Sequence, residues 1–141
     1  MSDLAIEGYA SLFWARDFND DVVASGAFAA SLAKTPPGRV KMLNQHDVSA
    51  PIGVWDAVEE DASGLYVRGR ILGASPQGRL AAALVQAGAL DGLSIGFRAV
   101  KARKDGSGRL RVLTEIDLWE VSLVTFPMLP GARLSVSRAA A

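Results

Sequence analysis

The sequence predicts an α+β fold that is mainly β, with about seven strands in an antiparallel, barrel-like sheet and two or more helices flanking it. Three observations lead to this class. Short segments of alternating apolar residues recur along the chain, turn-forming residues separate them, and few segments have helical spacing. The 141 residues are expected to form one domain, residues 1–141, and half of them are hydrophobic, enough for a substantial core.

Alternation and turn signals place the strands in chain order. The strongest turn signal is Asp105-Gly106-Ser107-Gly108, which is typical of a hairpin. An acidic loop before Gly64 indicates a second hairpin of the same kind. The strands are expected over residues 4–14, 40–44, 52–60, 65–70, 93–98 and 110–125, the last as one long strand or two short ones.

Two segments have the spacing of helices. In residues 25–33, Phe28 and Leu32 lie four positions apart, which predicts a short helix with Ser25 as its N-cap. A second helix is expected from Pro76 to about residue 87, because Ser75-Pro76 combines an N-cap with proline at the first helical position. This helix is expected to bury Leu80, Leu84 and Val85 and to end at Gly88.

Composition excludes several classes of protein. Fifteen basic residues balance fifteen acidic ones, so no nucleic-acid partner is expected. The absence of cysteine excludes a disulfide scaffold and a thiolate metal site, and a zinc site is not expected with one histidine. No Walker A or Rossmann motif occurs, so no cofactor is expected either. No apolar run approaches the roughly 20 residues that span a membrane, so no membrane partner is expected.

The first candidate catalytic residues are His46 and Ser94. His46 follows an apolar strand, where rigid scaffolds often carry catalytic side chains, and a neutral imidazole is the usual general base. Ser94 lies in Gly92-Leu93-Ser94-Ile95-Gly96, which matches the G-x-S-x-G pattern. The α/β-hydrolase fold is excluded, because it needs histidine after the serine. Glycines that permit close strand packing are the simpler explanation of the pattern.

Glu120 is the third candidate. In a regular strand it shares a face with Ile116, Leu118, Val124 and Phe126, and a carboxylate in such a row needs a partner. A protonated or hydrogen-bonded His46 is one such partner, whereas an arginine or a locally solvated strand is the alternative. Glu115 and Asp117 fall on the opposite face and are expected to be solvated.

A cluster of basic residues surrounds the predicted hairpin turn. Between Arg98 and Arg111 the chain carries Lys101, Arg103, Lys104 and Arg109. Such a cluster could contact an anionic partner, but a solvated hairpin is the favoured interpretation.

Three sequence blocks resemble the prohead proteases of tailed phages, the HK97-type family. They are Ser25-Gly26-Ala27-Phe28 with Ser31-Leu32, then KMLNQHDVSAPIG over residues 41–53, and finally GALDGLSIGF with EIDLWEVSLVTFP over 88–97 and 115–127. The resemblance covers about residues 5–133. It implies the fold of the herpesvirus assembly proteases, a β-barrel ringed by helices. A phage, a prophage or a gene transfer agent is compatible with it as a source.

The resemblance also implies a serine protease with the catalytic residues His46, Ser94 and Glu120. In the herpesvirus relatives a histidine opens the strand where Glu120-Val121-Ser122-Leu123 stands here, so Glu115 and Asp117 remain alternatives for the third position. His46 would take the proton of Ser94, and Glu120 would orient the imidazole. By analogy, oxyanion donors are expected around residues 128–132, although Pro127 and Pro130 have no N–H to donate.

The implied function is a capsid-maturation endopeptidase. It would act inside the assembling procapsid in the bacterial cytoplasm, cut the major capsid protein or a scaffold segment, and cleave itself. Self-association is a further expectation that the herpesvirus relatives raise. A non-catalytic barrel that binds capsid or scaffold protein, or a hydrolase of small esters, are the alternatives.

Overall fold

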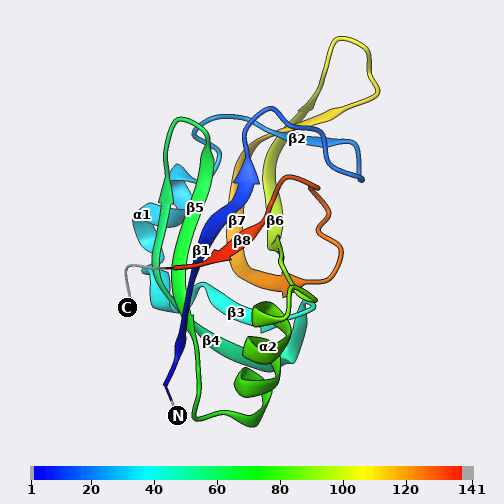
Figure 1. Ribbon diagram of the computed structural model, residues 1–141. Helices are drawn as coiled ribbons and strands as arrows, with labels where there is room; N and C mark the ends of the chain where they lie inside the picture. The colour runs from blue at the N-terminus through cyan, green and yellow to red at the C-terminus, as the bar shows by residue number, and fades with distance from the viewer. Residues whose placement is uncertain (1, 138–141) are drawn as a thin grey trace.

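The computed structural model describes residues 2–137, which form one curled, half-barrel sheet with two α-helices beside it (Figure 1). The predicted α+β, mainly-β class is therefore confirmed, with eight strands where about seven were expected. The strands are β1 (Leu4–Leu12), β2 (Asp21–Val23), β3 (Lys41–Asn44), β4 (Asp47–Glu60), β5 (Gly64–Ile71), β6 (Gly92–Lys104), β7 (Arg111–Val124) and β8 (Leu134–Val136). The helices are α1 (Ala29–Lys34), α2 (Pro76–Gln86) and the single 3₁₀ turn η1 (Pro37–Arg39).

The sheet is mainly antiparallel, as expected, and it also contains two parallel strand pairs. Its strand order is β2-β7-β3-β4-β5-β1-β8, and β6 pairs with β7. Both β2 and β3 run parallel to β7, β2 against residues 111–113 and β3 against residues 120–123. The long connections between these strands in the chain allow the crossovers that parallel pairing needs. β7 thus joins β3, which leads to His46, and β6, which carries Ser94.

A single hydrophobic core lies inside the curl of the sheet. Trp55 is 2% exposed, and its indole Nε1–H donates to the carbonyl oxygen of Val121 at 3.2 Å. Leu93, Val121 and Leu123 are fully buried under the region where β6 meets β7. Burial of each such aliphatic side chain contributes about 1.5–3 kcal/mol, so this part of the ladder is held rigidly.

The first helix begins later than predicted. α1 begins at Ala29, and Phe28, not Ser25, occupies the N-cap position without a side-chain cap. Gly26 has a φ of +87°, so residues 25–28 form a turn rather than helix. The Phe28 N–H donates instead to the Glu60 carboxylate at 3.0 Å. A carboxylate from β4, distant in sequence, therefore takes the role that the sequence assigned to Ser25.

The second helix has the predicted bounds but a different buried face. Ser75 Oγ accepts from the Gly78 N–H at 3.2 Å, and Gly88 has a φ of +77°, as expected for the two ends. The prediction that Leu80 and Leu84 are buried is wrong, since they are 64% and 40% exposed. The buried face consists of Gly78, Ala81 and Val85. A Cβ at Gly78 would collide with the carbonyl oxygen of Leu72, so the helix approaches the sheet through its small residues. Within residues 2–137 no helix is long and apolar enough to cross a membrane.

Candidate active site

His46 lies in a two-residue turn between β3 and β4. Gln45 and His46 both have positive φ, 54° and 61°, and Asn44 pairs with Asp47 across the turn. Positive φ at both central residues is the geometry of a type I′ hairpin turn. Neither residue is glycine, so this backbone conformation is costly and needs support from its surroundings.

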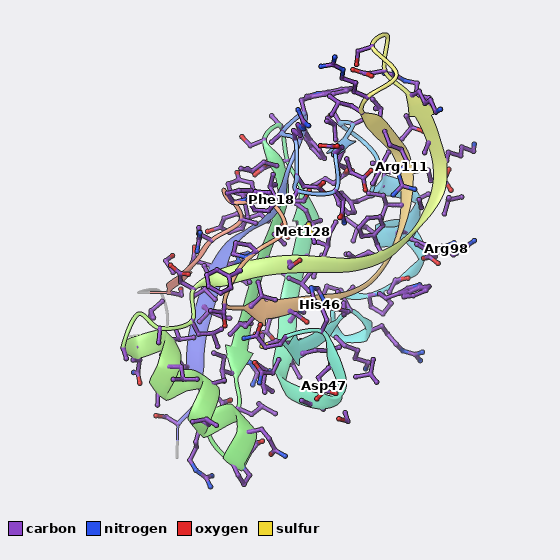
Figure 2. All side chains as sticks on the ribbon, turned by 90° about the vertical axis from the view of Figure 1, so that its right-hand side faces the viewer. Phe18, His46, Asp47, Arg98, Arg111 and Met128 are labelled. Atoms are coloured by element: carbon purple, nitrogen blue, oxygen red, sulfur yellow. The ribbon has the colours of Figure 1, made fainter. Side chains whose placement is uncertain are left out.

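Hydrogen bonds to β7 and to the residue that follows it supply that support. The Gln45 N–H donates to the carbonyl oxygen of Leu123 at 2.9 Å, and the Gln45 amide exchanges two hydrogen bonds with Thr125. The His46 N–H donates to Ser122 Oγ at 3.0 Å. The turn is thereby fastened to the C-terminal end of β7, and the imidazole is held in one position above that strand. Figure 2 shows His46 at this strand, at the centre of the molecule.

Glu120 reaches His46 because β7 contains a bulge. Gly96 pairs with Glu120 and Phe97 pairs with Leu118, so Trp119 is an extra residue in the ladder. The strict alternation assumed from the sequence therefore breaks at Trp119, and Phe126 is 89% exposed beyond the end of β7. The predicted face shared with Ile116, Leu118 and Phe126 is wrong, because the bulge turns Glu120 to the opposite face from Leu118 and Phe126 lies beyond the strand. Ser122 stays on the face of Glu120, as alternation expects.

The carboxylate of Glu120 contacts two polar groups. Its Oε2 lies 2.5 Å from His46 Nδ1, and its Oε1 accepts the Ser122 hydroxyl at 2.7 Å. The Glu120 side chain is 12% exposed, whereas that of His46 is 42% exposed. The hydrogen bond that His46 donates to Glu120 raises the pKa of His46 above its usual 6.5, although partial burial of the ring opposes the rise. The arrangement orients the ring and favours its charged form.

Gly96 makes room for this carboxylate. It stands opposite Glu120 in the β6–β7 ladder, and a Cβ at this position would collide with the Glu120 carboxylate. The second glycine of the G-x-S-x-G pattern is thus explained by the close approach of the Glu120 side chain to the β6 backbone. This agrees with the simpler explanation of the pattern, in which glycines permit close strand packing.

Ser94 lies on β6, directly opposite Ser122, and is 7% exposed. It lines a cavity of about 120 Å³ that His46 also lines. The apolar wall of this cavity includes Leu93, Ile95 and Phe97 of β6. The structure therefore brings His46 and Glu120 into contact and places Ser94 in the same cavity as the imidazole.

Two loops complete the cavity. One contributes Asp17 and Asn19, and the other contributes Met128 and Leu129. The Phe18 N–H donates to the carbonyl oxygen of Met128 at 3.0 Å, which ties the loops together, and the two labelled side chains lie side by side in Figure 2. Burial raises the pKa of Asp17, although its carboxylate accepts two backbone N–H groups.

The carboxylates that remained alternatives to Glu120 contact other groups. Glu115 pairs with Lys101 at 3.7 Å, and Asp117 pairs with Arg98 at 3.8 Å. In the loop expected to supply oxyanion donors, the Ala132 N–H donates to the carbonyl oxygen of Leu129 at 2.9 Å, so this group is already engaged. Across residues 2–137 no group of three or more histidine, cysteine or acidic side chains could hold a metal ion.

Sequence reasoning missed three residues that hold the site. Ser122 supports both His46 and Glu120, and Gln45 with Thr125 locks the turn. For Ser122 a signal was present, because a hydroxyl two positions after Glu120 lies on the same strand face. The pairing of Gln45 with Thr125 spans 80 residues and has no local signal.

The amino-acid sequence is similar to those of phage prohead proteases. A family model described as "Caudovirus prohead serine protease" matches residues 1–141. The prohead protease of Enterobacteria phage HK97 is 37% identical over 123 residues, which are 86% of this chain and 54% of that protein. The chain thus spans about half the length of that curated relative.

Solved proteases share the fold. The bacteriophage T4 capsid assembly protease has a TM-score of 0.68 at 18% identity, over 86% of this chain and 82% of that one. The KSHV protease bound to a hexapeptide phosphonate inhibitor has a TM-score of 0.67 at 14% identity, over 97% and 66% of the two chains. The varicella-zoster virus protease has a TM-score of 0.60 at 16% identity, over 97% and 65%. At these identities the likeness concerns the fold.

Proposed function

The chain belongs to the caudovirus prohead serine protease family, and from this premise we propose that it is the serine endopeptidase that cuts capsid or scaffold protein within the procapsid. The observation that carries the proposal is the contact of His46 with Glu120 at the cavity that Ser94 lines. A largely buried carboxylate, an oriented imidazole and a nearby serine are the parts of an activated nucleophile. The major capsid protein or a scaffold segment is the proposed substrate, and the chain itself is a second one.

The proposed reaction follows the roles of these groups. Ser94 Oγ attacks the carbonyl carbon of the scissile peptide while His46 Nε2 takes the hydroxyl proton. The Nδ1–H of His46 donates to Glu120, which stabilises the imidazolium that forms. The proton then passes to the leaving amine, and water, deprotonated by His46, hydrolyses the acyl-enzyme.

Glu120 suits the orienting role better than Glu115 or Asp117. Its carboxylate is mostly buried and is held from two sides, by His46 Nδ1 and by Ser122 Oγ. The other two acids pair at longer range with exposed cations of β6. The contacts of Glu120 with the imidazole therefore favour His46, Ser94 and Glu120 as the catalytic residues.

Co-expression with the major capsid protein encoded beside this chain tests the proposal. We expect the wild-type chain to remove a defined segment of the capsid protein and Ser94→Ala to remove none, because the attacking oxygen is absent. Intact mass measurement of the capsid protein gives the cleavage site directly, and the mass of the protease reports self-cleavage. Cleavage that persists with Ser94→Ala would exclude Ser94 as the nucleophile. If neither form cuts, the proposal fails and the non-catalytic capsid- or scaffold-binding module remains as the alternative.

A further inference from the structure

The outer part of β6 is exposed, whereas the part of β7 opposite to it is partly buried. The loop that joins β6 to β7, residues 105–110, extends beyond the rest of the molecule at the top of Figure 1. Every residue of β6 from 100 to 104 is exposed, so this part of the strand covers no core on either face. We call residues 98–111 the basic arm.

The basic arm concentrates positive charge on a chain that is neutral as a whole. It holds six of the fifteen basic residues and one of the fifteen acidic residues. That one acid, Asp105, is engaged in the turn, where its carboxylate accepts from the Leu110 N–H at 3.2 Å and from Ser107 Oγ at 2.8 Å. The arm is therefore cationic while the remainder of the chain carries an acidic surplus.

Most of these cations are free to bind a partner. Arg111 is the exception, because Asp21 binds its guanidinium through two hydrogen bonds of 2.9 Å. Arg98 and Lys101 form ion pairs of 3.8 and 3.7 Å while 62% and 72% exposed, and such surface pairs are weak. Arg103, Lys104 and Arg109 form no ion pair with any residue from 2 to 137.

β6 also offers an unpaired edge beside these cations. One edge pairs with β7, and the other meets residues 132–133 only at Gly92 and Leu93. Beyond that point no other strand in the described part of the chain pairs with the outer edge of β6. Its outward N–H and C=O groups can therefore pair with an added extended chain.

We propose that the basic arm is the docking surface for an acidic, extended segment of the polypeptide that this protease cuts. The proposal rests on the function proposed above. A polypeptide can satisfy both features of the arm, because its backbone pairs with the strand edge while its carboxylates meet the cations. A nucleic acid fits less well, since residues 98–111 include no aromatic side chain on which bases could stack.

The course of β6 relates this surface to the candidate active site. One continuous strand runs from Ser94 to the arm, and Figure 2 shows it passing His46 and continuing past Arg98 toward the hairpin. Arg103 follows Ser94 by nine residues, which corresponds to about 30 Å of extended chain. A substrate that lies along this edge would place its acidic residues about nine positions from the cleaved bond.

The test compares two triple variants that remove equal charge. Arg103→Gln, Lys104→Gln and Arg109→Gln together remove the free cations of the arm. Lys34→Gln, Arg39→Gln and Arg68→Gln remove three exposed cations elsewhere and serve as the matched control. The substrates are the full capsid precursor and a short peptide that spans only the residues next to its cleaved bond, both at about 0.1 M salt, where charges are only partly screened.

We expect the arm variant to lose about tenfold or more in kcat/KM on the precursor and to keep its value on the short peptide, because docking, not chemistry, is removed. The control variant should match the wild type on both substrates. Equal precursor cleavage by the arm variant and the wild type would overturn the proposal, and the cations would then only protect the strand edge from aggregation.

Binding of the precursor to the Ser94→Ala chain separates this proposal from the proposed function. If adding the arm substitutions to the Ser94→Ala chain abolishes binding of the precursor, the docking proposal is supported. This holds even if the wild-type chain does not cut the precursor, a result that would overturn only the proposed function. Binding that is independent of the arm overturns the docking proposal. Arm-dependent binding to a DNA duplex, without binding to the precursor, also overturns it.

Discussion

The two halves of the β6–β7 ladder differ in almost every physical respect. Near the start of β6, Leu93 is fully buried, Ser94 is 7% exposed, and the opposite residues of β7 carry the support for His46. At the far end, residues 100–104 are all exposed and mostly charged or small. In the inner half, the buried apolar side chains hold the polar groups of the candidate site in fixed positions. In the outer half β6 covers no core, whereas Val112, Leu113 and Ile116 of β7 remain buried, so the exposed strand of this half is suited to binding rather than to catalysis. One hairpin thus combines a rigid candidate site with a solvated surface.

The largest expected effect concerns the carboxylate at the inner half. Glu120→Gln should lower kcat/KM by a factor on the order of 10²–10⁴, because the imidazolium loses the charge that stabilises it. The acidic limb of the pH profile should also move to lower pH. The base acts when neutral, and Glu120 holds the pKa of His46 above 6.5 in the folded chain. Measurement of kcat/KM from about pH 5 to 9 checks both effects.

Asp117→Asn is the matched control for this variant, since Asp117 lies three positions earlier on the same strand and pairs with Arg98. Its pH profile should equal that of the wild type. A reversed result, with loss at Asp117 and none at Glu120, would contradict the assignment.

The same pair of groups links stability to pH. Because the pKa of His46 is raised in the folded chain, its contact with Glu120 stabilises the fold fully below the unfolded value near 6.5. This contribution is lost as the pH rises through the folded pKa. Its size is reduced by solvent, since the imidazole is 42% exposed.

A packing test compares the two halves directly. Leu93→Ala should lower the free energy of unfolding by about 2–5 kcal/mol, because it leaves a cavity beneath Ser94. Val100→Ala on the same strand should change it by less than about 0.5 kcal/mol, because Val100 is 40% exposed. Urea unfolding of both variants gives the comparison. Equal losses would mean that the outer half of β6 is packed in solution, which would contradict the exposure of residues 100–104.

Ser122→Ala should have a smaller effect than the substitution at Glu120. The hydroxyl donates to Glu120 and accepts from the His46 N–H, so its loss leaves one donor and one acceptor without a partner. We expect a loss of about 1–3 kcal/mol in unfolding free energy. We also expect a drop in kcat with little change in KM, because Ser122 positions the imidazole without reaching the cavity. Ser122→Thr retains a hydroxyl and should recover part of the rate, which a purely structural role in the core would not predict.

The smallest effect is expected at the tip of the outer half. Asp105→Ala removes the carboxylate that accepts from Ser107 and Leu110 in the exposed turn. Cleavage of a short peptide and the Tm should both stay at wild-type values, since no residue of the candidate site contacts this turn. A changed kcat/KM on the short peptide would show that the turn at the tip of the hairpin affects the candidate active site.

Local patterns in the sequence determined much of this protein. The alternation of apolar residues predicted most of the strands, and Ser75-Pro76 with Gly88 marked the ends of α2, because propensity and capping act over a few residues. The same patterns, together with the family resemblance, singled out His46, Ser94 and Glu120 as candidates. They also predicted the tight turn at residues 105–108 between β6 and β7.

Only the tertiary structure decided which of these residues meet. The bulge at Trp119 sets Glu120 against Gly96 and His46, and a regular alternation could not reveal it. The exposure of Leu80 likewise depends on how closely α2 approaches the strands. The physical reason is the same in both cases. Local periodicity determines which face of an element is apolar, whereas register and close approach depend on segments that are distant in the chain.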